Sequence, residues 1–188
     1  MASLRVHNQM VDLVREVLER QLAEWESVCQ CQKCFDDRVA YALNRLDPLY
    51  AASEDAAALT LERLDKDRVY TIIAVCTEAL ERIQDQPRHD AAASGLALYN
   101  YTENLVSTMI NAVAQEMGNV CTCDTCLDQV AAHALDQLPP KYAVSHKGQQ
   151  YVRLDELDHK LRNAVLTAVC SGFVAVRKRG DCSFYAAK

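Results

Sequence analysis

The chain has 188 residues, of which 50% are hydrophobic and 24% are charged, and its formal net charge is -6 at pH 7. This balance is ordinary for a soluble globular protein, and five glycines with four prolines favour regular structure, mostly helix, over disorder. The acidic total argues against duplex nucleic acid as the main partner, because neutralising phosphates requires a basic surface. No membrane partner is expected either, since no apolar stretch reaches the roughly 18 residues of a membrane span.

The chain start and the cysteine content indicate the compartment. Residues 1–10 lack a basic start followed by an apolar run and a small-residue cleavage site, so no secretion signal is predicted. We therefore expect a cytoplasmic protein. In a reducing compartment, nine cysteines are expected to be metal ligands or buried thiols rather than disulfides.

Three helices are predicted in the first half of the chain. Apolar residues at three- and four-residue spacing predict a helix from Leu4 to about Glu26. A cysteine-rich loop follows, and a second helix is predicted from Asp36 to Leu46, where Asp47-Pro48 stops it. A long helix is predicted from about Leu59 to Gln86.

The second half of the chain repeats this order. Its first helix is marked by apolar residues from Leu98 to Met117, and its second is predicted from Leu127 to Gln137. Residues 141–154 alternate apolar and polar side chains around a glycine, which predicts a short β-hairpin. The last long helix is predicted from Asp155 to about Val176.

The two halves are an internal repeat. The segment Val28–Ser53 aligns with Val120–Ser145 at a constant offset of 92 and is identical at 13 of 26 positions. We therefore predict two repeats, residues 1–90 and 91–188. Units of this size are close to the lower limit for a sufficient apolar core, and they commonly need a covalent or metal staple.

The cysteines supply candidates for that staple. Each repeat has a Cys-x-Cys-x-x-Cys loop, and closed tetrahedral zinc needs a fourth ligand, which we assign to a cysteine on each long helix. The predicted zinc sites are Cys29, Cys31, Cys34 and Cys76 in one repeat, and Cys121, Cys123, Cys126 and Cys170 in the other. The ninth cysteine, Cys182, is assigned to neither site. Alternatives are buried thiols on the long helices with redox-active loop cysteines, or an iron–sulfur cluster, which uses the same ligands.

The cysteine loop, the following alanine- and leucine-rich helix and Leu138-Pro-Pro-Lys-Tyr142 resemble the late competence development protein ComFB family. The segment 99–106 resembles the family's opening Asn-x-x-Glu-x-x-Val helix, and Gln86-Pro-Arg-His89 is similar to the Asn-Pro-Arg-His ending of single-domain members. The resemblance covers nearly the whole chain. It implies an all-helical, tandem, zinc-containing protein built as an internal pseudo-two-fold dimer that could associate further. It also implies a receptor for cyclic di-GMP, as described for cyanobacterial members.

Neither repeat carries every feature of the family. The first has Val11 at the position of the opening glutamate and Asp47 in the Leu-Pro-Pro-basic-Tyr motif, while the second ends in Val176-Arg-Lys-Arg179 instead of Pro-Arg-His. Our hypothesis is that, across a pseudo-dimer interface, each repeat supplies what the other lacks.

A cyclic dinucleotide requires cations for its phosphates and flat groups for its guanines, and arginine can serve both needs. The candidate ligand-binding residues are Arg88, His89, Lys141, Tyr142, Arg177, Lys178 and Arg179. Each has a structural alternative: solvated residues at a helix exit, cations that complete a helix C-terminus, or a tyrosine that only packs.

No catalytic grouping of an activated nucleophile or a poised acid and base is evident, so we do not expect an enzyme. The leading hypothesis is a cytoplasmic receptor for a cyclic dinucleotide, most readily cyclic di-GMP, that signals to a downstream protein. The alternative is a zinc-stabilised adaptor that binds another protein and no nucleotide.

Overall fold

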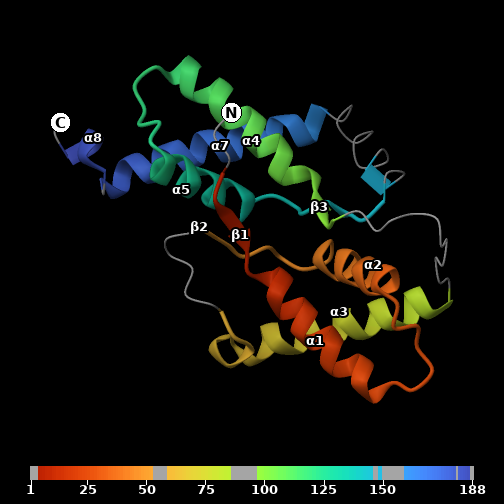
Figure 1. The fold of residues 1–188 in the computed structure, drawn as a ribbon. Helices are drawn as coiled ribbons and strands as arrows, with labels where there is room; N and C mark the ends of the chain where they lie inside the picture. Colours follow the sequence, from red (N-terminus) through yellow and green to blue (C-terminus); the bar gives the residue numbers. More distant parts are fainter. Residues whose placement is uncertain are drawn as a thin grey trace.

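The computed structural model describes residues 4–52, 59–85, 97–145, 148–149, 159–180 and 182–186. It consists of two helical repeats that lie one above the other in Figure 1. Repeat 1 contains β1 (Val6–Asn8), α1 (Met10–Glu24), α2 (Gln32–Leu43), β2 (Tyr50–Ala52), the 3-10 turn η1 (Leu61–Arg63) and α3 (Lys66–Asp85). Repeat 2 contains β3 (Tyr99–Asn100), α4 (Tyr101–Met117), α5 (Asp124–Leu135), β4 (Tyr142–Ala143), α7 (His159–Arg179) and α8 (Ser183–Ala186).

Each repeat has a two-stranded antiparallel sheet, formed by the strand before its first helix and the strand after its second. Asn8 pairs with Tyr50 in repeat 1, and Asn100 pairs with Tyr142 in repeat 2. These pairs are equivalent under the offset of 92, so the repeat extends from the sequence to the strand register. The first strand of the predicted second-half hairpin is β4, which pairs with β3, more than forty residues earlier. Most of the remaining residues of that hairpin lie outside the described part.

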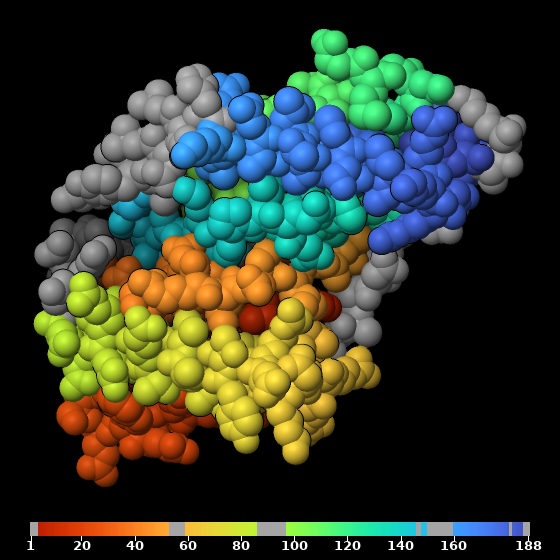
Figure 2. Space-filling view, turned by 180° about the vertical axis from the view of Figure 1, so that it is seen from behind, coloured from red at the N-terminus to blue at the C-terminus, as the bar shows by residue number. Residues whose placement is uncertain are grey.

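The small sheet of each repeat packs against the second helix of the other repeat. Strands β1 and β2 pack on α5 of repeat 2, and β4 packs on α2 of repeat 1. Accordingly, the buried ring of Tyr50 belongs to the apolar core of repeat 2, and that of Tyr142 belongs to the core of repeat 1. Figure 2 shows the back face, where α2 and α5 lie side by side in the middle. Helix α7 lies beyond α5, and helix α3 lies beyond α2. The repeats therefore form an internal pseudo-two-fold dimer with reciprocal contacts.

The helices of the first repeat are found where the apolar spacing predicts them, but their starts differ. Helix α1 begins at Met10 rather than Leu4, because Asn8 ends a strand and its side chain accepts a hydrogen bond from the Met10 amide at 3.2 Å. Helix α3 begins at Lys66, after Asp65, whose carboxylate accepts from the Arg68 amide at 2.8 Å. Side-chain caps thus set boundaries that apolar spacing alone does not resolve.

In repeat 2, α4 ends at Gly118, which has a left-handed φ of 62° and donates its amide to Ala114. This is a common way for a helix to end, and it directs the chain into the second cysteine loop. Both second helices begin inside the cysteine motif, with Cys31 and Cys123 as their N-cap residues. Among the described helices, none has the length and apolar character needed to cross a membrane.

Candidate metal centres and the pocket between the repeats

The cysteine loop of repeat 1 gathers three thiols. The sulfur atoms of Cys29, Cys31 and Cys34 all lie within 4.8 Å of one another. The first turn of α2 fixes this arrangement, since the Cys34 amide donates to the Cys31 sulfur at 3.5 Å. Burial and contacts with the other two cysteines raise the pKa of the Cys34 thiol to about 12, so this thiol holds its proton until a cation competes for it.

The cysteine loop of repeat 2 gathers four thiols. Cys121, Cys123, Cys126 and Cys182 have sulfur atoms within 4.8 Å of one another. The sulfur of Cys121 lies 3.4 Å from that of Cys123 and 3.5 Å from that of Cys182, and the Cys123 and Cys182 sulfurs are 4.0 Å apart. In a tetrahedral zinc site with Zn–S bonds of about 2.3 Å, the sulfurs are separated by about 3.8 Å. The four thiols therefore fit a tetrahedral metal ion.

The assignment of the fourth ligands requires correction. Cys170 lies partly buried against the core of repeat 2 and outside the cluster, while Cys182, for which the sequence predicts no ligand role, lies within it. Cys76 is fully buried in the core of repeat 1 and is not grouped with the loop thiols either. Burial raises the pKa of the Cys76 thiol to about 12, as expected of an apolar environment. The equivalence of Cys76 and Cys170 thus reflects shared core packing.

A buried arginine lies beside the thiols of repeat 1. Arg38 is fully buried, and its Nη1 donates to the Cys29 carbonyl oxygen at 2.7 Å. It follows Cys34 by one helical turn, so the two side chains share a face of α2. Two of its nitrogens, Nε and Nη2, have no hydrogen-bond partner. A buried cation needs a compensating anion, and a metal held by three thiolates would carry a net negative charge.

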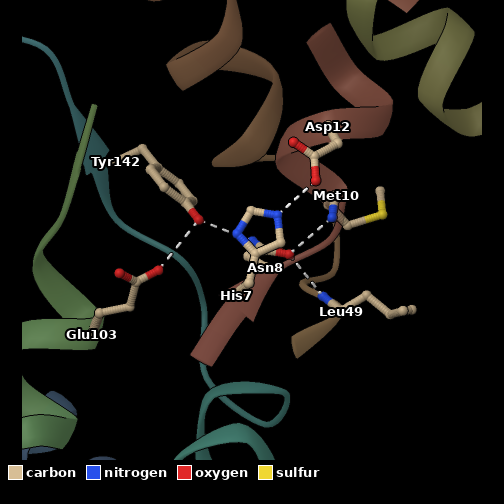
Figure 3. Close-up of polar contacts among 7 residues, drawn as sticks. All are labelled: His7, Asn8, Met10, Asp12, Leu49, Glu103 and Tyr142. Atoms are coloured by element: carbon tan, nitrogen blue, oxygen red, sulfur yellow. Dashed lines mark hydrogen bonds and ion pairs between the residues drawn. The ribbon is translucent and has the colours of Figure 1, made fainter. Parts of the chain in front are cut away.

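A polar cluster joins the repeats at their centre. The Tyr50 hydroxyl donates to Glu103 at 2.6 Å and accepts from the Asn100 amide at 2.8 Å. The Tyr142 hydroxyl accepts from the Asn8 amide at 3.0 Å and lies 3.5 Å from the same carboxylate oxygen of Glu103, as Figure 3 shows for Tyr142.

Each asparagine also organises its own repeat. Asn8 accepts from the Leu49 amide at 3.1 Å, and Asn100 accepts from the amides of Thr102 at 3.0 Å and Lys141 at 3.2 Å. Figure 3 also shows the nearby exposed hydrogen bond of 2.6 Å between His7 and Asp12. The asparagines therefore cap helices and bridge strands.

Burial makes the two central tyrosines, Tyr50 and Tyr142, weaker acids than an exposed tyrosine. It raises the pKa of Tyr50, and the neighbouring Tyr142 and Glu103 raise it further. Burial and Glu103 also raise the pKa of Tyr142. Glu103 has no counterpart in repeat 1, where Val11 occupies the equivalent position. One carboxylate therefore serves two pseudo-equivalent phenols.

A pocket lies between the two helix-exit segments that the repeat makes equivalent. Its walls are residues 44–48 after α2 and residues 136–140 after α5, and its volume is about 290 Å³. The segments are tied together across the repeats: the Tyr142 amide donates to Asn44 at 2.6 Å, and the Tyr50 amide donates to Asp136 at 2.7 Å. The pocket thus lies on the pseudo-two-fold axis.

Arg45 supplies a cation at this pocket. Its guanidinium lies 3.4 Å from the centre of the Tyr41 ring, its Nη1 donates to the Tyr41 carbonyl at 3.2 Å, and its Nε lies 3.9 Å from a Glu78 oxygen. Asp47 adds an exposed carboxylate to the same wall. Neither residue was among the sequence candidates, because a charged residue after a helix has no distinctive spacing.

The sequence candidates for ligand binding that fall in the described part of the chain are not brought together. Lys141 follows the pocket wall directly, but the ring of Tyr142 is only 6% exposed and packs in the core of repeat 1, which favours the packing alternative. Arg177, Lys178 and Arg179 are exposed in the last turn of α7, beside α8 in Figure 1, and line none of the described pockets. Arg88 and His89 lie outside the described residues.

The fold and its clusters define a tandem pair of small helical repeats, each with a group of thiols that could hold a metal ion. A family model described as late competence development protein ComFB matches residues 7–87 and again residues 99–180. The chain therefore belongs to the ComFB family and contains two copies of its domain. Competence protein ComFB of Bacillus subtilis (strain 168) is 26% identical over 76 residues, covering 40% of this chain and 78% of that protein. No solved structure matches the chain.

Proposed function

We propose that this ComFB protein is a cytoplasmic receptor for a cyclic dinucleotide, with cyclic di-GMP as the first ligand to test, on a scaffold stabilised by zinc. The observation that carries the proposal is the pocket on the pseudo-two-fold axis, lined by two equivalent segments. A cyclic dinucleotide has two equivalent halves. A site whose walls are related by a pseudo-two-fold axis can offer each half a similar backbone surface.

The chemistry of the pocket suits such a ligand. The guanidinium of Arg45, stacked on Tyr41, can bind a phosphate or stack on a base. The carboxylates of Asp47 and Asp136 can accept hydrogen bonds from the N–H groups at the edge of a guanine. Lys141, which follows the lining residue Pro140 directly in the chain, is the proposed source of a second cation.

The pocket volume bears on how the ligand would lie. About 290 Å³ is at the lower end of ligand pockets, which commonly measure roughly 300–1,000 Å³. The pocket would therefore enclose one base, and the remainder of the dinucleotide would extend over its rim toward Lys141. In this arrangement Arg45 acts from one repeat and Lys141 from the other, which is a specific form of the complementation hypothesis.

Zinc is the proposed metal because thiolates are among its preferred ligands and four of them form a closed structural site. Such a site leaves no open position for a substrate, so its proposed role is to hold the α4–α5 loop and not to react. The proposed scaffold places both cysteine loops at the starts of α2 and α5, the helices whose ends form the pocket.

Competition binding of fluorescently labelled cyclic di-GMP to the metal-loaded full chain tests the proposal. Arg45→Ala is expected to weaken binding by about tenfold or more, because it removes a charge-assisted contact worth roughly 1.5–3 kcal/mol. Arg177→Ala, which removes an exposed cation far along α7, serves as the matched control and should bind as the wild type does. Equal loss in both variants would indicate non-specific attraction, and a wild type that binds no dinucleotide would overturn the proposal.

A second candidate, a protein-binding adaptor, is favoured by exposed apolar side chains on the outer helices. Tyr70 is 67% exposed and Ile73 is 39% exposed on α3, and Val174 is 45% exposed on α7. Exposed apolar groups of this kind occur at protein interfaces when they are contiguous. Specific binding of a protein partner that Tyr70→Ser abolishes, in the absence of any dinucleotide binding, would establish this candidate instead.

A further inference from the structure

We propose that two copies of this chain form a dimer in which the exposed face of α7 of each copy packs against the exposed face of α3 of the other. The inference goes beyond the receptor proposed above, because it requires neither a dinucleotide nor a metal ion. It also commits to one occupant, a second copy of the chain, for the exposed apolar side chains of the outer helices.

The exposed face of α7 is apolar along its centre and basic toward its ends. Leu166 is 43% exposed and Val174 is 45% exposed, and Cys170 lies between them at the same four-residue spacing, so the three residues follow one side of the helix. Arg162 and Lys178 are exposed near the two ends. Helix α7 contains five lysines and arginines and no aspartate or glutamate, although the whole chain has a net charge of -6. This face is therefore complementary to an apolar helix with acidic residues.

The exposed face of α3 has that chemistry. Tyr70 is 67% exposed and Ile73 is 39% exposed, and Glu81 and Asp85 are exposed in the last two turns. Among the residues that the structure describes, four of the six exposed large apolar side chains lie on α3 and α7. The two helices therefore carry most of the apolar groups that a partner could cover, with opposite charges beside them.

The positions of the two helices allow both contacts to form at once. Figure 2 shows α3 and α7 on the same face of the molecule, running in opposite directions. A two-fold axis parallel to these helices would place α7 of each copy against α3 of the other. Rotation about such an axis keeps the direction of each helix, so the paired helices would be antiparallel, which their macrodipoles favour. A closed two-fold dimer is the commonest form of symmetric assembly.

This antiparallel arrangement pairs complementary side chains. Helix α3 has 20 residues and α7 has 21, so aligning their midpoints places Val174 near Tyr70 and Arg162 near Glu81 and Asp85. Within the described part of the chain, neither Arg162 nor Glu81 takes part in an ion pair, so both can bind a second copy. A contact between two α7 helices would instead oppose like charges, which is costly.

Sedimentation velocity of the full chain at increasing concentration tests the inference. The wild type should pass from monomer to dimer, and added salt should weaken the association. Glu81→Lys and Arg162→Glu should each weaken dimerisation by about tenfold or more, because like charges replace opposite ones. A mixture of these two variants should dimerise as the wild type does, since the altered α3 of one meets the altered α7 of the other.

The control variant is Asp12→Lys, which changes the net charge as much as Glu81→Lys does. It lies at the start of α1, which Figure 1 shows on the opposite face of the molecule, so it should dimerise as the wild type does. Val174→Ser removes only an apolar contact and should weaken dimerisation without changing its dependence on salt.

The outcomes separate this inference from the receptor proposal. A wild type that stays monomeric at every concentration would overturn the inference and leave the receptor proposal intact. A mixture of Glu81→Lys and Arg162→Glu that does not dimerise, or equal weakening by Asp12→Lys, would show that α3 and α7 do not pair. Growth beyond a dimer would contradict the two-fold arrangement.

Discussion

The two repeats share a backbone plan but complete it with different chemistry at equivalent positions. In repeat 1, α2 carries the buried Arg38 beside three thiols. In repeat 2, the equivalent residue is Val130, and Gly172 of α7 packs so closely that an added Cβ would lie 2.8 Å from the Val130 carbonyl oxygen. Repeat 2 thus has an apolar helix contact and four grouped thiols. Duplication preserved the layout, while the charge around each cysteine loop diverged.

A similar asymmetry occurs at the centre of the molecule. Glu103 contacts the hydroxyls of both Tyr50 and Tyr142, while Val11 occupies the equivalent place in repeat 1. In a dimer of identical repeats, two carboxylates would approach each other there, and like charges in a buried site repel. The tandem chain allows one carboxylate to serve both tyrosines.

Metal removal is expected to have the largest effect on stability. Structural zinc contributes about 10–16 kcal/mol in small peptides, which is comparable to the whole stability of a typical domain. We expect a chelator to lower the free energy of unfolding of the zinc-loaded chain by about 5 kcal/mol or more. Urea denaturation with and without the chelator measures this difference, with zinc-saturated chelator as the control. Superimposable curves would show that no metal supports the fold.

Replacing Glu103 is expected to have the next largest effect. Glu103→Val introduces the residue of the equivalent position in repeat 1 and removes the acceptor of the Tyr50 hydroxyl. Leaving buried donors without partners costs about 1–3 kcal/mol each. Urea denaturation should therefore show a loss of about 2 kcal/mol or more. Asp12→Ala, which removes an exposed contact with His7 and an acidic residue from the first turn of α1, should cost about 1 kcal/mol or less. Equal losses in the two variants would contradict a stabilising role for the central cluster.

Arg38 offers a test that separates the two metal sites. If its charge offsets the thiolates of repeat 1, Arg38→Met should weaken metal binding in that repeat by roughly tenfold, or about 1.4 kcal/mol, and leave repeat 2 unaffected. Competition between the protein and a chromogenic chelator resolves the two affinities. The metal-free variant should be as stable as the wild type or more stable, since an incompletely paired buried charge has been removed. Equal weakening at both sites would contradict a local role.

Raising the pH into the alkaline range should lower the free energy of unfolding by a smaller amount. The pKa of Tyr50 is raised in the folded chain, so its contribution to stability is fully present below the unfolded tyrosine pKa of about 10 and is lost as the pH rises above that value. Tyr50→Phe removes this titration and should lose less stability than the wild type between about pH 8 and pH 11. Denaturation at the two pH values measures the loss. Tyr70→Phe, at a 67% exposed site, should behave as the wild type, and identical losses in Tyr50→Phe would contradict this origin.

The sequence determined the repeat and the helices because both leave regular patterns. The cysteine loops, the offset of 92 and the apolar spacing predicted two helical repeats, and the strand register obeys the same offset. The strands were missed because two- and three-residue segments are too short for a period to be recognised. The apolar spacing instead includes β1 and β3 in the starts of helices, the alternating pattern includes β4 in a local hairpin, and β2 falls in a predicted connection.

The candidate sites were less predictable, since they depend on contacts between distant segments. The equivalence of Cys76 and Cys170 suggested two fourth ligands, whereas both positions serve the cores of the repeats. Cys182 had one available signal, its place two residues after a glycine that ends the last long helix. Arg45 and Glu103 acquire their surroundings only when the repeats pack together.

A calorimetric titration of the zinc-loaded full chain with cyclic di-GMP tests the central claim most directly, with cyclic di-AMP and GTP as controls. Because the pocket lies on the pseudo-two-fold axis and draws one wall from each repeat, we predict selective binding of one ligand per chain. Two ligands per chain would place independent sites in the separate repeats. No heat from a chain that carries its metal would contradict the receptor.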